Sequence, residues 1–382
     1  MTRFTRRTLL ASALLSACST RKRAKRYAGW LFVASGAERA IAVANLSDFR
    51  RMTTIPLAHA PDLLLAGQKH VYSLSGEGAE LLEIDPATLK ITARMPLPGK
   101  PLTARFADEH SAGILLITIE SPAQIIALNL TNRTIVGRTP LPGPAVDLDV
   151  NGQNAAVAIP SQRAIVRLSA TDLKVAGTTS VGVPCQVLRF RNDGRTILAG
   201  SADARQVVTV DVASGALLAR LPLPLAPSHF CFNSDGGQMF VTGAGQDSVT
   251  IVSPYQNEVG ETMLAGRTPD AMAISIPRNL LLVTNRETGD LTILDIETRH
   301  LSASVHVGGV PGEVMVTPDG EYALVLDRAS GSVSVVRLDT VLEPNKGDAP
   351  AAVVQLRTKP LFTTFATAGD ARSALIVPSP VV

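Results

Sequence analysis

The sequence contains few aromatic residues, few charged residues and no long apolar segment. Aromatic residues make up 4% of the 382 residues and charged residues 18%, and there is a single tryptophan. No segment reaches the roughly 18 to 20 consecutive apolar residues that a membrane-spanning helix requires. We therefore expect no helix of the mature chain to cross a membrane.

The sequence also lacks the short motifs that mark most cofactor, metal and nucleophile sites. The six histidines show no metal-ligand spacing, and there is no Cys-x-x-Cys-His segment for haem. A Gly-x-Ser-x-Gly turn and a phosphate-binding loop are absent as well. We therefore predict no cofactor and no metal, with a divalent metal expected only if the protein is a hydrolase.

A repeat runs through most of the chain and is marked by proline. Eight prolines recur at intervals of 40, 43, 40, 43, 42, 42 and 49 residues. They are Pro61, Pro101, Pro144, Pro184, Pro227, Pro269, Pro311 and Pro360. A period of about 40 to 50 residues with several short strands is typical of a β-propeller, in which each repeat forms one blade. We therefore predict an all-β propeller that occupies residues 27–382 as a single domain.

The repeat that begins at Pro269 shows how one blade is built. It predicts four antiparallel strands, at residues 271–276, 280–284, 290–296 and 301–307. Other repeats carry Pro-Leu-Pro in the fourth strand, as at residues 96–98. Because proline cannot donate a hydrogen bond to a neighbouring strand, it is confined to edge strands. The fourth strand is therefore expected at the outer edge of each blade.

The two ends of the chain determine the expected number of blades. Three strand-like runs precede the first repeat proline, at residues 30–34, 40–46 and 51–57. We predict that residues 361–366 supply the inner strand of this N-terminal blade. Pairing of the two ends would close eight blades without an exposed edge. Residues 374–378 are then a surplus strand-like run, so seven blades with an extended terminus remain the alternative.

The N-terminus has the features of a bacterial export signal. Three arginines precede a short apolar run at residues 9–17, a pattern typical of signal peptides. The end of this run, Leu15-Ser16-Ala17-Cys18, resembles the lipobox of bacterial lipoproteins, in which the cysteine thiol receives a diacylglycerol. Residues 5–10 also look like a twin-arginine export motif, so the export route stays open.

These features divide the chain into three parts. We predict a lipoprotein signal peptide at residues 1–17, a lipidated Cys18 with a basic tether at residues 18–26, and the propeller at residues 27–382. The lipobox resemblance implies an exported protein anchored by lipid in the bacterial cell envelope, on the periplasmic side or in the outer membrane.

Positive charge is concentrated near the predicted anchor. The whole chain carries a net charge of +3, but residues 27–382 hold 28 Lys and Arg against 33 Asp and Glu. A basic run beside a lipid anchor suits anionic headgroups. The repeats themselves show no basic stripe or aromatic platform, which argues against nucleic-acid binding. The expected partners are therefore the membrane, through the anchor, and a protein or small molecule on a propeller face of a monomer.

Segments of one repeat resemble a known family. Leu281-Leu-Val-Thr-Asn285, Leu291-Thr-Ile-Leu-Asp-Ile-Glu-Thr298 and Val307-Gly-Gly-Val-Pro311 are similar to the YVTN-type repeat. The resemblance extends over about residues 27–382, although many repeats match it only loosely. It implies a propeller of seven or a similar number of blades, known from surface-layer, lipoprotein and lactonase-like contexts. The resemblance thus implies a scaffold and not one activity.

Candidate site residues come from the expected mouth of the central channel, near the start of each inner strand. Of the residues two positions after the eight prolines, three are strongly polar, namely Gln186, His229 and Glu313. If their side chains converge, they would bind a small polar ligand, with His229 and Glu313 as an acid–base or metal pair. The alternative is that they are solvated rim residues around a water-filled tunnel.

Two classes of function fit these features. The favoured one is a binding or assembly scaffold, anchored in the cell envelope, for a protein or a small ligand. The alternative is a lactonase-like hydrolase in which His, Glu and Arg side chains at the channel mouth polarise a lactone and activate water, with a divalent metal if one is used. No residue is assigned as catalytic. The number of titratable side chains that converge at the channel mouth distinguishes the two.

Overall fold

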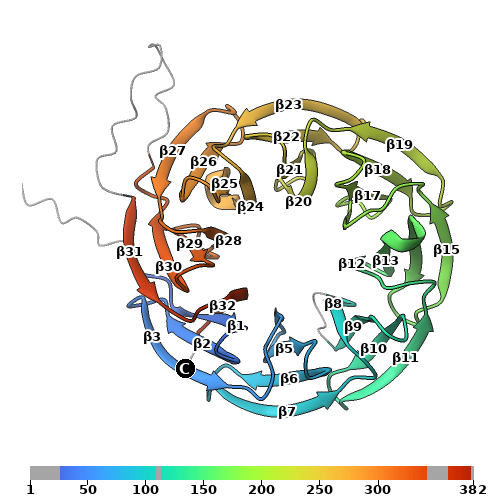
Figure 1. Cartoon of the computed structure of the whole chain (residues 1–382), viewed down its shortest axis with the longest axis horizontal. Coiled ribbons are helices and arrows are strands. Elements are labelled where there is room, and N and C mark those ends of the chain that lie inside the picture. The colour runs from blue at the N-terminus through green and yellow to red at the C-terminus, as the bar shows by residue number, and fades with distance from the viewer. Residues whose placement is uncertain (1–25, 109–112, 342–359, 380–382) are drawn as a thin grey trace, which may run out of the picture.

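The computed structural model describes residues 26–108, 113–341 and 360–379. Eight four-stranded antiparallel sheets form a closed ring, with one edge of each sheet near the ring axis and the other at the rim (Figure 1). The predicted eight-bladed propeller is therefore confirmed, and the seven-bladed alternative is wrong. We call the face of the ring on which the inner strands begin, for example Pro101 and Pro269, the upper face.

Each blade has four strands that follow one another from the ring axis outward. The first blade consists of β32 (Ala371–Pro378), β1 (Gly29–Ser35), β2 (Ala40–Asn45) and β3 (Arg50–Pro56). The second blade consists of β4 (Leu63–Ala66), β5 (Val71–Ser75), β6 (Glu80–Asp85) and β7 (Lys90–Pro96). The third consists of β8 (Pro101–Phe106), β9 (Ile114–Ile119), β10 (Gln124–Asn129) and β11 (Thr134–Pro140). The fourth consists of β12 (Asp147–Asn151), β13 (Asn154–Ile159), β14 (Ala164–Ser169) and β15 (Val175–Ser180). The fifth and sixth are β16 (Val187–Phe190), β17 (Thr196–Ser201), β18 (Gln206–Asp211) and β19 (Leu217–Pro222), then β20 (Ala226–Phe232), β21 (Met239–Ala244), β22 (Ser248–Ser253) and β23 (Glu258–Leu264). The last two are β24 (Pro269–Ser275), β25 (Leu280–Asn285), β26 (Asp290–Asp295) and β27 (Leu301–His306), then β28 (Pro311–Val316), β29 (Tyr322–Asp327), β30 (Ser332–Arg337) and β31 (Leu361–Ala366). Two 3₁₀ turns, η1 (Pro160–Gln162) and η2 (Ile276–Arg278), join strands in the fourth and seventh blades.

The middle strands of each blade carry the core because both of their faces are covered. β9 and β25 are runs of branched apolar residues, and nearly every position in them is buried. Strands buried on both faces read as continuous apolar runs and not as alternating ones. The outer strand β7 alternates between exposed and partly buried residues and ends at Pro96. The prediction that proline marks the outer edge is therefore confirmed.

The ring is closed by a different strand from the one predicted. Residues 361–366 form β31, the outer strand of the eighth blade, and not an inner strand of the first (Figure 1). The inner strand of the first blade is β32, which contains the surplus run at 374–378 and pairs with β1 along its full length. Residues 343–352 are an insertion between β30 and β31 in the sequence. This insertion places the fourth strand of the eighth blade later in the chain, so Pro360 precedes an outer strand. These inserted residues lie outside the described part of the chain.

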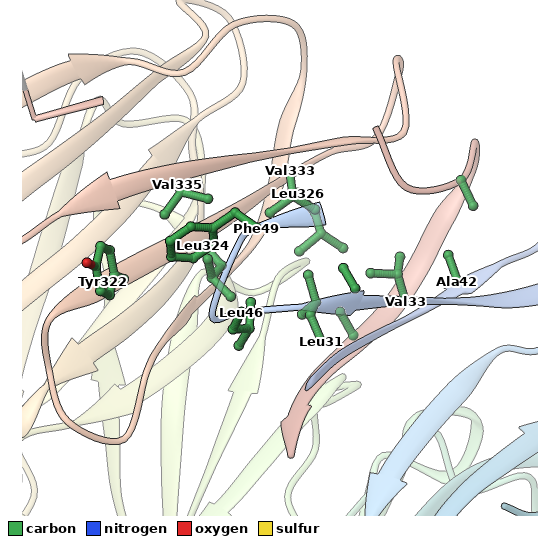
Figure 2. Close-up of a cluster of buried hydrophobic side chains, with 13 residues drawn as sticks. Leu31, Val33, Ala42, Leu46, Phe49, Tyr322, Leu324, Leu326, Val333 and Val335 are labelled. Carbon is green, nitrogen blue, oxygen red and sulfur yellow. The ribbon is translucent and has the colours of Figure 1, made fainter. Parts of the chain in front are cut away.

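A buried cluster joins the first and last blades across the closure. Leu31 and Phe49 of the first blade pack against Tyr322 and Leu324 of the eighth (Figure 2). The Phe49 ring lies edge-on to that of Tyr322, with centroids 5.2 Å apart. Ala374 of β32 belongs to the same cluster. The two ends of the chain are thus held together by shared apolar burial as well as by strand pairing.

Neighbouring blades are also linked by a hydrogen bond that recurs at three of the junctions between blades. The threonine near the end of the second strand donates to a backbone carbonyl at the start of the next inner strand: Thr118 to Ala145 at 3.1 Å, Thr242 to Asp270 at 2.6 Å and Thr284 to Gly312 at 2.9 Å. All three threonines are fully buried. Thr284 is the threonine of the Val-Thr-Asn segment, so this part of the repeat holds the inner strands in place.

Thr284→Val is expected to lower the free energy of unfolding by about 1 to 3 kcal/mol. The isosteric valine keeps the volume but leaves the Gly312 carbonyl and the Ala271 N–H, which also bonds to Thr284 Oγ1, without their partner. Denaturant unfolding measures the loss. Thr53→Val, on an exposed position of β3, is the control and should change stability little. An equal effect of both substitutions would contradict the role given to Thr284.

No helix in the described ranges is long and apolar enough to cross a membrane. The predicted signal peptide and Cys18 fall outside those ranges. The export and lipidation predictions therefore remain predictions.

Candidate functional site

The three residues predicted from the sequence do not have the same surroundings. Gln186 precedes β16, is exposed, and its Oε1 accepts a hydrogen bond from Ala202 N at 3.1 Å. This bond ties Gln186 to the loop between the second and third strands of its own blade. His229 lies in the middle of β20 and Glu313 is the third residue of β28, both on inner strands. Only these two have a common neighbour, Arg328, whose charge acts on both of their pKa values.

Glu313 binds the strand that closes the ring. Its Oε2 accepts a hydrogen bond from Ala374 N in β32 at 3.1 Å. Burial raises the pKa of Glu313 to about 7, against the opposing effects of this hydrogen bond and of Arg328. Glu313 is therefore partly protonated near neutral pH, and one of its oxygens is engaged in the fold.

His229 faces an acidic neighbour on the next blade. Its Nδ1 lies 3.0 Å from Ser228 Oγ and 3.9 Å from Asp270 Oδ1. Although 43% of its side chain is exposed, the surrounding walls desolvate it, and this lowers its pKa despite the opposing effect of Asp270. His229 is consequently neutral at physiological pH. In the ranges that the structure describes, no three His, Cys, Asp or Glu side chains lie close enough together to hold a metal ion.

Asp270, which the sequence-based prediction missed, is the centre of this part of the upper face. Its Oδ2 lies 3.5 Å from Arg328 Nη1 and 3.8 Å from Arg286 Nε, in addition to the contact with His229. The carboxylate is 13% exposed, and Oδ2 has no hydrogen-bond partner among the described residues. We refer to His229, Asp270, Arg286, Glu313 and Arg328 as the Asp270 cluster.

The strand pairing is irregular at both acidic residues of the cluster, near the start of their inner strands on the upper face. The pairing of β24 with β25 shifts between Pro269 and Met272, around Asp270. A similar shift occurs between Pro311 and Val314, around Glu313. Such bulges re-aim side chains at the ends of sheets. The Asp270 backbone is fixed from the preceding blade by the hydrogen bond from Thr242.

The two arginines occupy the same position in neighbouring blades. Each is the first residue after the second strand, and its N–H donates to the loop that leads into its own inner strand, from Arg286 to Thr268 and from Arg328 to Val310. In the other six blades the first residue after the second strand is Gly36, Gly76, Glu120, Pro160, Ala202 or Gly245. Only the seventh and eighth blades therefore place a basic side chain here, on either side of Asp270. Alignment of the second strands could have found this pair in the sequence.

A second set of charges lies on the inner strands of the fourth and fifth blades and is internally paired. Arg189 of β16 binds Asp147 of β12 at 2.7 Å, and Asp147 Oδ2 also accepts from Leu188 N at 2.8 Å. Asp149 accepts from Phe190 N at 2.7 Å, and burial raises its pKa. These side chains join neighbouring inner strands, and both carboxylates already accept backbone hydrogen bonds from the next blade.

Comparison with known proteins identifies the family. A family model described as the YNCE-like β-propeller matches residues 144–360, more than half of the chain. The chain belongs to the YNCE-like β-propeller family. A search of curated proteins finds no match.

Solved structures similar to this YNCE-like chain share its fold at low sequence identity. Dihydro-heme d1 dehydrogenase NirN in complex with DHE has a TM-score of 0.70 and 16% identity, with 83% of this chain and 72% of that chain covered. Apo AztD from Citrobacter koseri has a TM-score of 0.68 and 15% identity, with 93% and 100% covered. Hydrazine synthase from Kuenenia stuttgartiensis has a TM-score of 0.56 and 16% identity, with 72% and 95% covered. At these identities the similarity concerns the fold alone.

Proposed function

We propose that this YNCE-like propeller is an exported, lipid-anchored binding protein that holds a small polar ligand at the Asp270 cluster. The observation that carries the proposal is that Arg286 and Arg328, from two neighbouring blades, converge on one mostly buried carboxylate. Pockets that bind small molecules combine a few convergent polar groups with a rigid frame. The frame here is a closed ring of sheets.

The lactonase-like alternative has less support from the same residues. Asp270, the carboxylate nearest to His229, contacts two arginines as well, and Glu313 is bonded to the closing strand. A general base must be free to take a proton from water or substrate. The cluster is therefore better suited to holding a ligand than to activating water.

A thermal-shift screen tests the binding proposal. The purified mature protein should be stabilised by at least one compound from a panel of small sugars, amino acids, amines, dicarboxylates and phosphates, because a ligand that binds only the folded state raises the midpoint of unfolding. Asp270→Asn should change the response to that compound, whereas Asp211→Asn, on the opposite face, should not. A panel in which nothing stabilises the protein would overturn the proposal.

Cys18→Ser is expected to release the protein from the membrane. The substitution removes the thiol that would receive the lipid, and stable attachment to a bilayer is expected to require the acyl chains in addition to the basic tether at residues 18–26. Fractionation of an expressing bacterium, with intact-mass analysis of the product, measures the effect. Thr20→Ala, just beyond the cysteine, is the control and should remain membrane-bound. Unchanged membrane partitioning of Cys18→Ser would contradict the anchor.

A further inference from the structure

Arg286 and Arg328 have hydrogen-bonding capacity that the fold does not use. Each guanidinium has five N–H donors. Within the described ranges neither guanidinium donates a hydrogen bond, and their charge contacts with Asp270 are 3.8 Å and 3.5 Å long. The two side chains are 47% and 42% exposed. Donors of both groups are therefore available on the upper face.

Another arginine on the upper face, Arg372, shows how carboxylates can pair with the donors of a guanidinium. Arg372, at the start of β32, binds Asp62 through Nη1 at 2.6 Å and Asp370 through Nε at 3.1 Å. One arginine is thus held by two carboxylates. At the Asp270 cluster the ratio is reversed, because two arginines share one carboxylate.

The charges of the cluster leave a positive excess. Arg286 and Arg328 each contribute one positive charge and Asp270 one negative charge. His229 is neutral at physiological pH, and Glu313 carries only part of its negative charge there. A partly desolvated site with a net positive charge favours an anion, because Coulomb interactions there are screened less than in bulk water.

We propose that Arg286 and Arg328 bind a small oxyanion, either a carboxylate or a phosphate, between the seventh and eighth blades. This inference rests on the proposed function and names the ligand class of that site. The planar guanidinium matches carboxylate and phosphate oxygens with two parallel hydrogen bonds. A ligand with two such oxygens would give each arginine a hydrogen-bonded partner that Asp270 alone does not provide.

The backbone beneath Arg328 leaves room for its side chain. A Cβ atom added at Gly312 of β28 would overlap with Nε and Cγ of Arg328. The Gly312 carbonyl is fixed by the hydrogen bond from Thr284 Oγ1 at 2.9 Å. Arg328 therefore lies against an inner strand whose position is set by the preceding blade, and a side chain at residue 312 would displace the guanidinium without removing its charge.

Isothermal titration of the mature protein with succinate and with inorganic phosphate tests the proposal. We expect one of the two probes to bind with a stoichiometry of about one, and which one binds identifies the source of the oxyanion. Arg286→Gln and Arg328→Gln should each weaken binding about tenfold or more, the loss of about one charge-assisted hydrogen bond. Gly312→Ala should weaken it as well, because the charge remains but moves.

The control is Arg267→Gln, on the same face. Arg267 pairs with Glu287 at 3.5 Å and is not part of the cluster, so its loss should leave the affinity within about twofold. Unfolding transitions of all variants show whether each still folds. If Gly312→Ala does not fold, the test rests on Arg286→Gln and Arg328→Gln.

Two outcomes overturn the inference. One is that the protein binds neither probe; the other is that Arg267→Gln weakens binding as much as the cluster variants. Binding of a neutral or cationic compound that depends on Asp270, with no binding of either anion, would overturn the oxyanion but keep the proposed function. Stabilisation by no compound at all would overturn both.

Discussion

A chain that ends at Asp370 is expected to lose its cooperative unfolding transition. The truncation removes β32, which supplies the whole inner strand of the first blade and pairs with β1 from Gly29 to Ser35. It also takes Ala374 out of the cluster that joins the first and eighth blades, and removes Leu375 and Val377 from the packing between the first and second blades. Leu375 and Val377 are partly buried, so each contributes less than the cost of about 2 to 5 kcal/mol for a fully buried core side chain. Their loss adds to the loss of a whole inner strand, against a total stability of about 5 to 15 kcal/mol.

Two side-chain hydrogen bonds at the junctions of β32 are lost with the strand. Glu313 of the eighth blade binds Ala374 N, and Ser373 Oγ accepts from Leu64 N of the second blade at 3.1 Å. The truncated chain would expose the edge of β1, and an open strand edge promotes association. Size-exclusion chromatography should show aggregates, and circular dichroism should show no sharp thermal transition.

The matched control ends at Pro378 and keeps all of β32. It should unfold like the full chain, since only residues 379–382 are removed. A truncation at Asp370 that stays monomeric and unfolds at the midpoint of the full chain would show that β32 does not close the ring. The comparison separates loss of the strand from any general effect of shortening the C-terminus.

The repeat allowed most of the fold to be predicted, and the closure shows why the rest was not. Seven of the eight prolines lie at the start of an inner strand or shortly before it, so the interval between them gave the blades correctly. Pro360 precedes β31 because the eighth blade contains an insertion before its outer strand. A period counts residues and does not recognise an insertion. The prediction therefore assigned the closing inner strand to residues 361–366, which form β31, one strand before the true closing strand β32. The strand-like run at 374–378, which fitted no repeat, was the one sequence feature that indicated β32.

The candidate site was predicted only in part, because the residues were aligned on one strand. Counting from the proline found His229 and Glu313 but treated Gln186 as their equivalent, although Gln186 bonds to its own loop. Asp270 lies one residue after its proline, in a bulge that a fixed offset does not follow. Arg286 and Arg328 follow the second strand, in a loop that the inner-strand count does not reach. Their relation depends on the contact between blades, which no single repeat contains.

We expect the parent protein to lose stability as the pH rises through about 7, and Glu313→Gln to remove this loss. The pKa of Glu313 is about 7 in the folded protein, above its ordinary value of 4.5. A carboxyl whose pKa is raised by folding stabilises the fold fully below the unfolded value, and that stabilisation disappears as pH rises through the folded value. The contribution is therefore present at about pH 4.5 and lost by about pH 8, with a size of about 3 kcal/mol.

Glutamine mimics the protonated carboxyl and can still accept the hydrogen bond from Ala374 N through its amide oxygen. The variant should match the parent protein near pH 5 and exceed it near pH 8, when denaturant unfolding is measured at both values. Glu287→Gln, on an exposed loop of the same face, removes a carboxylate without touching the closing strand and should leave the difference between the two pH values unchanged. A Glu313→Gln variant that keeps the pH dependence of the parent would show that Glu313 is already ionised at the closure.

The same titration links closure of the ring to the charge of the Asp270 cluster, because Glu313 is bonded to β32 and is also acted on by Arg328. Ionisation of Glu313 adds negative charge near Arg328 and so offsets part of the positive excess of the cluster. Raising the pH through about 7 should therefore weaken the binding of succinate, whose carboxylates are already ionised in this range, in the parent protein and not in Glu313→Gln.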